Sequence, residues 1–284
     1  MILHYKEYLF AIAILFAFWA FGIGSTYGFS IFPDEFAYWS YAARLAGYDW
    51  SDVTALAPYY SYGYSLILIP IFVFCKDAVT AYRIAVSINF LFLFLAMVAL
   101  AGTMKRMMPD KKMPIVLFSA LTVLLPCNLF YTQMTLTEVF LVALYIAAGS
   151  VLYRYLENNR LSTLLLLMLI LIYLYTVHMR TVGVLLAAMI VVTIHIFLRG
   201  DKRWHVLAAL GAALALFAAA DFLKQQAFVY VYGGINQELV AANDYSGQME
   251  KIRSVLSLEG FYDLLISLAG KVLYLGLATW GLFY

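Results

Sequence analysis

Residues 84–103 read IAVSINFLFLFLAMVALAGT, and the cations Lys105 and Arg106 follow directly. An uncharged helix of this length is about 30 Å long, which matches the hydrocarbon core of a bilayer. The whole chain has the same character, because 65% of its 284 residues are hydrophobic and only 12% are charged. A soluble domain carries about 25% charged residues. The sequence therefore predicts an all-α, polytopic transmembrane helix bundle, and its net charge of +2 gives no sign of nucleic acid as a partner.

Further apolar runs bounded by charges predict the other membrane spans. With the first, they cover residues 8–27, 84–103, 113–132, 139–153, 161–177, 182–198 and 206–220, and a last run starts at Val272. Together they predict a single transmembrane domain, residues 1–284, of about eight spans. The run at 8–27 is longer than the roughly 7–15 apolar residues of a signal peptide. The last run stops at Tyr284 after 13 residues, so we expect the N-terminal part of a longer protein; the alternative is a half-span packed against the bundle.

The apolar segment at residues 59–75 has two interpretations, because it either crosses the membrane or lies at its surface. Cytoplasmic loops of membrane proteins are rich in lysine and arginine. If the segment does not cross, and the N-terminus is cytoplasmic, three basic loops all face the cytoplasm; their cations are Lys105, Arg106, Lys111, Lys112, Arg154, Arg160, Arg199, Lys202 and Arg203. We therefore interpret the segment as an interfacial or re-entrant helix.

This topology brings four segments to the outer face of the membrane. They are a first outer loop at 28–82, the turns at 133–138 and 178–181, and a second long outer loop at 221–270. Loops of this length are usually functional or disordered. Their aromatic-rich composition argues against disorder, so we expect a functional site on this side.

The clearest local signal is the stretch from Phe32 to Gly47, in which Pro33 opens a helix and Gly47 closes it. Asp34 and Glu35 lie in its first turn, next to the positive end of the helix dipole. The helix follows the first span directly, so both carboxylates are expected where water meets lipid headgroups. The alternative is that the acidic pair simply makes a good helix start.

Two charged side chains at the ends of predicted spans are further candidates. Glu138 precedes only 15 residues of apolar helix before Arg154, about 22 Å, which would draw the carboxylate below the outer surface. Arg180 and His178 follow the run at 161–177, at the depth of lipid phosphates. The alternatives are a helix cap for Glu138 and a snorkelling anchor for Arg180.

Four weaker substrate-binding candidates lie in or next to the segment at 59–75. Lys76 and Arg83 are possible phosphate contacts, although interface anchoring explains them equally well. Tyr60 and Tyr64 belong to a tyrosine group that is either an interfacial belt or a platform for a sugar ring. The two cysteines, Cys75 and Cys127, suggest neither a disulfide nor a metal site.

Taken in order, these motifs resemble the membrane-embedded GT-C glycosyltransferases, which include protein O-mannosyltransferases and the bacterial aminoarabinose transferase of lipid A. The matching motifs, within residues 1–200, are Pro33-Asp34-Glu35, Tyr62-Gly63-Tyr64-Ser65-Leu66, Ala81-Tyr82-Arg83 and Thr137-Glu138. The resemblance implies that Asp34 is the catalytic carboxylate, with Glu35 as its partner and Glu138 as a second acidic group. It also implies that Arg83 and Arg180 bind the donor phosphate.

The sequence departs from this family in two ways. It lacks an acidic-plus-histidine metal pair, so the cofactor is unknown and a divalent metal is only possible. The family also usually has more spans.

The expected function is transfer of a sugar, with inversion, from a polyprenyl-phosphate donor to a glycan, lipid or protein acceptor. The expected place is the outer face of a bacterial inner (plasma) membrane, with membrane lipids as further partners. A phosphate leaves readily once a cation neutralises its charge, and a carboxylate can take the proton of the attacking hydroxyl. Two alternatives stay open: a lipid or sugar transporter (flippase), and a non-catalytic scaffold of the same fold.

Overall fold

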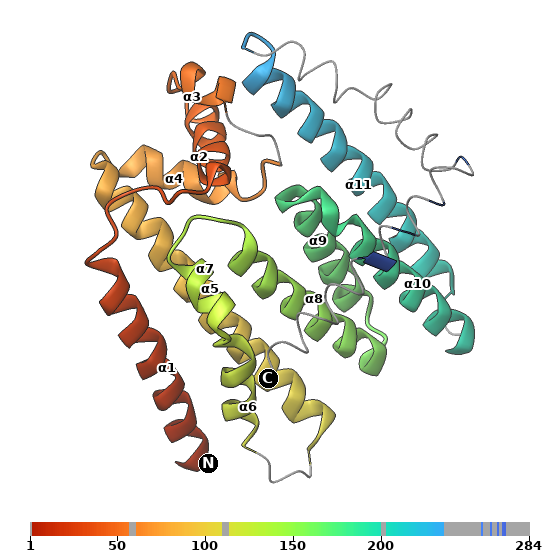
Figure 1. The fold of residues 1–284 in the computed structure, drawn as a ribbon. Coiled ribbons are helices and arrows are strands. Elements are labelled where there is room, and N and C mark those ends of the chain that lie inside the picture. Colours follow the sequence, from red (N-terminus) through yellow and green to blue (C-terminus); the bar gives the residue numbers. More distant parts are fainter. Residues whose placement is uncertain are drawn as a thin grey trace. The chain divides into compact units, whose positions relative to one another are not determined.

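Apolar helices make up the regular structure of the computed structural model (Figure 1). The structure describes residues 2–56, 61–109, 114–199 and 203–235, and the single residues 257, 262, 266, 269 and 270; these contain helices and no strand. The elements are α1 (Ile2–Ile23), α2 (Pro33–Leu45), α3 (Ser51–Leu56), α4 (Ser65–Phe74), α5 (Ala78–Met107), α6 (Ile115–Val123), α7 (Pro126–Thr132), α8 (Glu138–Asn158), α9 (Leu161–Val177), η1 (Met179–Thr181), α10 (Val182–Arg199) and α11 (Arg203–Tyr232). The chain divides into two units, residues 1–227 and 228–284. All the candidate site residues described below belong to the first unit.

Four of the described helical segments are long and apolar enough to cross a membrane. They are α5, α8, Met179–Leu198 and Ala209–Tyr232, and the bent pair α6–α7 would make a fifth. The apolar part of α1, Tyr8–Ile23, and all of α9 are shorter than 18 residues. The described residues thus have the helices of an integral membrane protein, with fewer full-length spans than the eight expected. The run from Val272 lies outside the described residues.

The predicted span at 113–132 is broken into two helices. Helices α6 and α7 meet at an angle of 61°, and Pro126 is the first residue of α7. Proline has no backbone N–H and clashes with the preceding turn, so a straight helix cannot pass through it. The Asn128 side chain donates a hydrogen bond to the carbonyl of Val123 at 2.9 Å, which satisfies a backbone group at the break.

Two helices extend further than the sequence suggested. Helix α8 has 21 residues, about 32 Å, because it continues past Arg154. The apolar run between Glu138 and Arg154 is unchanged by this extension, so the depth of Glu138 stays a prediction. Helix α11 continues through Asp221 to Tyr232, so the second outer loop does not begin at residue 221.

The segment between α1 and α5 agrees better with its prediction. Helix α2 begins at Pro33, and after its end Gly47 adopts a φ of +87°, a conformation that glycine reaches without strain. Helix α4 has 10 residues and is about 15 Å long, half the length needed to cross. This length fits an interfacial or re-entrant helix.

Helix α5 forms the centre of the first unit, where it packs against α1, α6 and α8 (Figure 1). Its side chains Val86, Leu93 and Met97 are completely buried. The Thr103 hydroxyl donates a hydrogen bond to Ser150 Oγ on α8 at 2.7 Å. Small and hydroxylated residues at such contacts let apolar helices approach closely. The α5–α8 pair is therefore a central contact of the first unit.

Gly63 attaches the turn before α4 to the end of α9. Its N–H donates to the carbonyl of Thr176 at 2.7 Å, and its carbonyl accepts a hydrogen bond from the Tyr173 hydroxyl at 3.0 Å. A Cβ atom on Gly63 would lie 2.6 Å from backbone atoms of Thr176 and Val177. The two segments are therefore closer than any side chain at this position allows.

We expect Gly63→Ala to lower the thermal unfolding temperature strongly, with a loss of about 2–3 kcal/mol, because two backbones must separate. Gly149→Ala in α8 is the matched control, since a Cβ there meets nothing within 4 Å. Alanine is the better helix former, so the control should be neutral or slightly stabilising. Equal unfolding temperatures for the two variants in detergent would contradict the close contact.

Candidate functional site

Glu35 is completely buried and receives hydrogen bonds from three segments of the chain. Its Oε1 accepts from the Tyr82 hydroxyl at 2.6 Å, from the Thr135 amide at 2.5 Å and from the Thr135 hydroxyl at 2.8 Å. Its Oε2 accepts from the Ser30 amide at 2.6 Å. The prediction that Glu35 lies at the membrane surface is therefore wrong, while its role as a partner of Asp34 stays a prediction. Its carboxylate instead joins α2 to α5 and to the α7–α8 turn.

The buried face of α2 adds three more hydrogen bonds. Trp39 Nε1 donates to Thr135 Oγ1 at 2.8 Å, and the hydroxyls of Tyr38 and Thr137 lie 3.3 Å apart. Ser65 Oγ donates to the carbonyl of Tyr38 at 2.9 Å. Thr137 immediately precedes α8. These bonds fix the start of α2, and with it Asp34, next to the start of α8.

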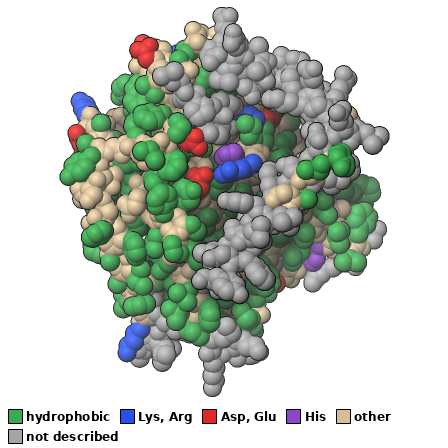
Figure 2. Space-filling model, in the orientation of Figure 1, with side chains coloured by type: hydrophobic (Ala, Val, Ile, Leu, Met, Phe, Trp, Pro, Cys, Tyr) green, Lys and Arg blue, Asp and Glu red, His purple; other side chains and the backbone are tan. Residues whose placement is uncertain are grey.

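Four of the candidate residues come together at this corner of the fold: Asp34, Glu138, His178 and Arg180, here called the charged cluster. Arg180 Nη2 lies 3.4 Å from Glu138 Oε1, in an ion pair between η1 and α8. His178 is close enough to both Arg180 and Asp34 for their charges to act on its ring. Figure 2 shows acidic, basic and histidine side chains next to one another on one face of the molecule. Three segments that are far apart in the sequence thus meet at one place.

His178 is held in a defined tautomer within the charged cluster. Its Nδ1 accepts a hydrogen bond from the Arg180 backbone N–H at 3.3 Å, so the proton of the neutral ring is on Nε2. Burial first, and then the Arg180 cation, lower the pKa of His178 to about 4, although the Asp34 carboxylate opposes the shift. The ring is therefore neutral at physiological pH, with its proton on Nε2.

This lowered pKa predicts how stability changes with pH. Between pH 6.5 and about 4 the unfolded chain binds a proton at His178 that the folded protein does not. Stability should therefore fall as the pH drops from 6.5 towards 4. We expect His178→Gln, which cannot titrate, to lose less thermal stability than the wild type over this range. Parallel curves for the two proteins would contradict the neutral assignment.

Several polar atoms around the charged cluster are buried without a hydrogen-bond partner among the described residues. They are Glu138 Oε2, Thr181 Oγ1 on η1, and Ser61 Oγ, just before the turn that binds α9. A buried polar group without a partner costs about 1–3 kcal/mol, so such groups are rare without a reason. Hydroxyl groups of a bound substrate could donate to Glu138 Oε2, and phosphate oxygens could accept from the Thr181 and Ser61 hydroxyls.

Comparison with known proteins adds no family to this picture. No protein-family model, curated protein or solved structure matches the chain. The resemblance to GT-C glycosyltransferases therefore rests on the motifs of this sequence alone. The function has to be inferred from the chemistry of the charged cluster and its surroundings.

Arg83 is engaged at a different place. Its guanidinium donates to the carbonyl of Thr26 at 2.9 Å and of Gly24 at 3.2 Å, and it lies 5.3 Å from the ring centre of Tyr27. These contacts fix the linker that leaves α1. They use two of the five N–H donors of the guanidinium, so Arg83 has a structural role here and its contact with a phosphate stays a prediction.

The structure places the remaining candidate residues from the sequence in different environments. Tyr64 is buried, its hydroxyl donates to Asn89 at 3.4 Å, and its ring packs on Tyr38, so the interpretations as sugar platform and as interfacial belt are both wrong for it. Lys76 is exposed at the rim of a pocket described below. Tyr60 lies outside the described residues.

No metal centre can be assigned to these side chains. Within the described ranges, no three His, Cys, Asp or Glu residues are grouped so that they would hold a metal ion. The possible divalent metal of the sequence analysis therefore has no ligands assigned to it.

Sequence reasoning missed a buried ion pair on α11. Lys224 Nζ lies 3.3 Å from Asp221 Oδ1 and 3.0 Å from the Tyr175 hydroxyl, which itself donates to Asp221 at 2.5 Å. Tyr175 is one helical turn before His178 on α9. The signal was present, because an acid and a base three residues apart share one helix face. The sequence analysis instead predicts that a loop begins at residue 221.

Proposed function

We propose that this protein transfers a sugar from a polyprenyl-phosphate donor to an acceptor hydroxyl, with the charged cluster as its site. The observation that carries the proposal is the meeting of Asp34, Glu138, His178 and Arg180, which pairs a carboxylate with a cation and a neutral imidazole. A reaction in which phosphate leaves and a hydroxyl attacks needs these groups. The proposal places the cluster on the outer side of the bacterial plasma membrane, with the N-terminus inside.

In this reaction each residue has a separate task. Arg180 binds the phosphate oxygens and neutralises the charge that grows as the bond to the sugar C1 breaks. His178 donates its Nε2 proton as a hydrogen bond to the same group. Asp34 accepts the proton of the acceptor hydroxyl as its oxygen attacks C1 from the opposite face, which inverts the anomeric centre. Glu138 orients Arg180 through the ion pair at 3.4 Å.

Arg180→Ala tests the donor-binding task. Hydrogen bonds to charged groups are worth about 1.5–3 kcal/mol, so we expect affinity for a polyprenyl-phosphate sugar to fall by roughly 10- to 100-fold. The measurement is the rise in thermal unfolding temperature as donor is added to the purified protein. Arg154→Ala is the matched control, since Arg154 is an exposed arginine of α8 away from the cluster. Unchanged donor affinity would make Arg180 a membrane-interface anchor.

One observation favours a transporter as the second candidate. Asp221 and Lys224 lie within Ala209–Tyr232, a segment long and apolar enough to cross a membrane. Ionisable groups inside such a segment often mark a substrate pathway. Measuring whether a lipid-linked sugar is consumed or only moved across vesicles distinguishes the two functions.

A further inference from the structure

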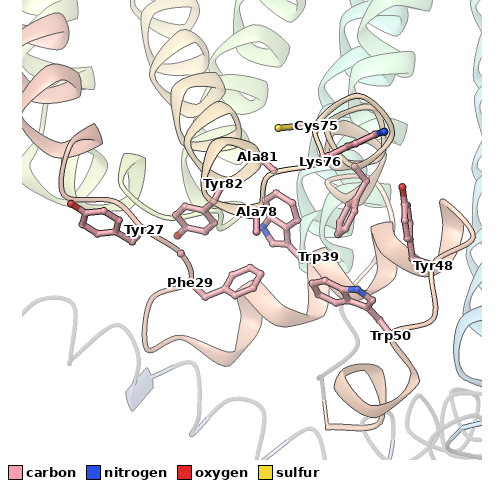
Figure 3. Close-up of a pocket in the computed structure, with 12 residues that line it drawn as sticks. Tyr27, Phe29, Trp39, Tyr48, Trp50, Cys75, Lys76, Ala78, Ala81 and Tyr82 are labelled. Carbon is pink, nitrogen blue, oxygen red and sulfur yellow. The ribbon is translucent and has the colours of Figure 1, made fainter.

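A cavity of about 570 Å³ lies beside α2, away from the residues assigned to the transfer reaction (Figure 3). It is bounded by the linker after α1, by α2, by the turn before α3, and by the α4–α5 junction. Seven aromatic side chains line it, among them Phe29, Trp39, Trp50 and Tyr82. Its size lies within the usual range of small-molecule pockets, about 300–1,000 Å³.

The walls of this aromatic pocket divide into an apolar side and a polar end. Trp39 and Tyr82 direct their polar atoms away from it, to Thr135 and Glu35, so that their ring surfaces face the cavity. Figure 3 shows the Tyr48 hydroxyl and the Lys76 ammonium group near each other at the opposite end.

Lys76 is a cation with no acidic partner. It is exposed and has no ion pair among the described residues. The neighbouring carboxylate of Asp77 is used to cap α5, where it accepts the Thr80 N–H at 2.7 Å. The polar end of the pocket therefore favours an anion.

The position and size of the pocket indicate a lipid chain. Phe74, two residues before Lys76, is 85% exposed, as expected where a side chain faces hydrocarbon. A cavity of about 570 Å³ lined by aromatic rings is of a size for a single acyl chain.

We propose that the pocket binds an anionic phospholipid of the bilayer, with one acyl chain among the aromatic rings and its phosphate at Lys76 and Tyr48. The second acyl chain stays in the membrane. This site does not depend on the transfer reaction, and it is separate from the donor site at Arg180. Because Trp39 and Tyr82 also belong to the Glu35 network, a bound lipid would stabilise the same segment that positions Asp34.

Tryptophan fluorescence tests this proposal in the full chain. Replacing Trp19, Trp204 and Trp280 by phenylalanine leaves Trp39 and Trp50 as reporters. The protein is reconstituted in phosphatidylcholine vesicles that contain a fixed minor fraction of lipid with brominated acyl chains, since bromine quenches tryptophan on contact. We expect brominated phosphatidylglycerol to quench several-fold more than the same fraction of brominated phosphatidylcholine.

Two variants separate the parts of the proposal. Lys76→Gln should remove the preference for phosphatidylglycerol, while Lys105→Gln, another exposed lysine, should keep it. Gly28→Phe should reduce quenching by both lipids, because Gly28 lines the pocket and a Cβ atom there meets nothing within 4 Å, which leaves room for a ring at the pocket wall. Equal quenching by the two lipids in the parent protein, or a preference that survives Lys76→Gln, would overturn the proposal. So would relief of quenching by unlabelled polyprenyl phosphate but not by unlabelled phosphatidylglycerol.

Discussion

Replacement of Asp34 by asparagine is expected to lower the rate of sugar transfer by about 10²- to 10⁴-fold, the usual contribution of a general base. Asparagine has the shape of aspartate but cannot take a proton from the attacking hydroxyl. The thermal unfolding temperature should hardly change, because Asp34 is only half-buried and α2 is held by its other residues. The rate is measured as polyprenyl phosphate released by the purified protein.

The matched control for this experiment is Asp52→Asn. Asp52 is an exposed acid in the first turn of α3, the next helix along the chain, and has no role in the proposed reaction. It should leave the rate unchanged. Full activity in Asp34→Asn would remove the catalytic assignment and favour a scaffold or a transporter.

Glu35→Ala should have the opposite profile, with its main effect on stability. The change leaves the Tyr82 hydroxyl, both donors of Thr135 and the Ser30 amide without their acceptor. Removing one partner from a buried charged network costs about 3–5 kcal/mol. We therefore expect a large fall in unfolding temperature in detergent, and faster hydrogen exchange at the amides of Ser30 and Thr135.

Two comparisons make this result specific. Glu35→Gln keeps one acceptor oxygen but places an amide nitrogen near a donor, so an intermediate loss of stability is expected. Asp34→Ala changes the adjacent residue of the same helix turn and should affect stability much less. Equal unfolding temperatures for Glu35→Ala and Asp34→Ala would contradict the role given to Glu35.

Some of this structure could be predicted because its signals are local. Pro33 and Gly47 mark the ends of α2 by their backbone preferences alone, and α9 has the bounds expected from its flanking residues Arg160 and His178. The end of α11 was not predictable in this way. Asp221 and Lys224 satisfy each other within the helix, so charge there does not mean exposure to water.

The burial of Glu35 could not be read from the sequence for a different reason. Its partners Tyr82 and Thr135 are 47 and 100 positions away in the sequence. The residues next to Glu35 do not indicate that it will contact them. An acidic residue in a first helical turn usually faces solvent, as its neighbour Asp34 partly does. The break between α6 and α7 at Pro126 could not be predicted from hydropathy, because the residues around it are as apolar as those of a continuous span.

The most direct test of the account is whether the purified protein consumes a lipid-linked sugar. A panel of polyprenyl-phosphate sugars is incubated with the wild type and with Asp34→Asn, each with a hydroxyl acceptor, and released polyprenyl phosphate is measured. The account predicts that the wild type consumes one donor, releases one polyprenyl phosphate for each sugar transferred, and inverts the anomeric centre, whereas Asp34→Asn releases almost none. Equal release by both proteins, or movement of intact donor across vesicles without release, would contradict it.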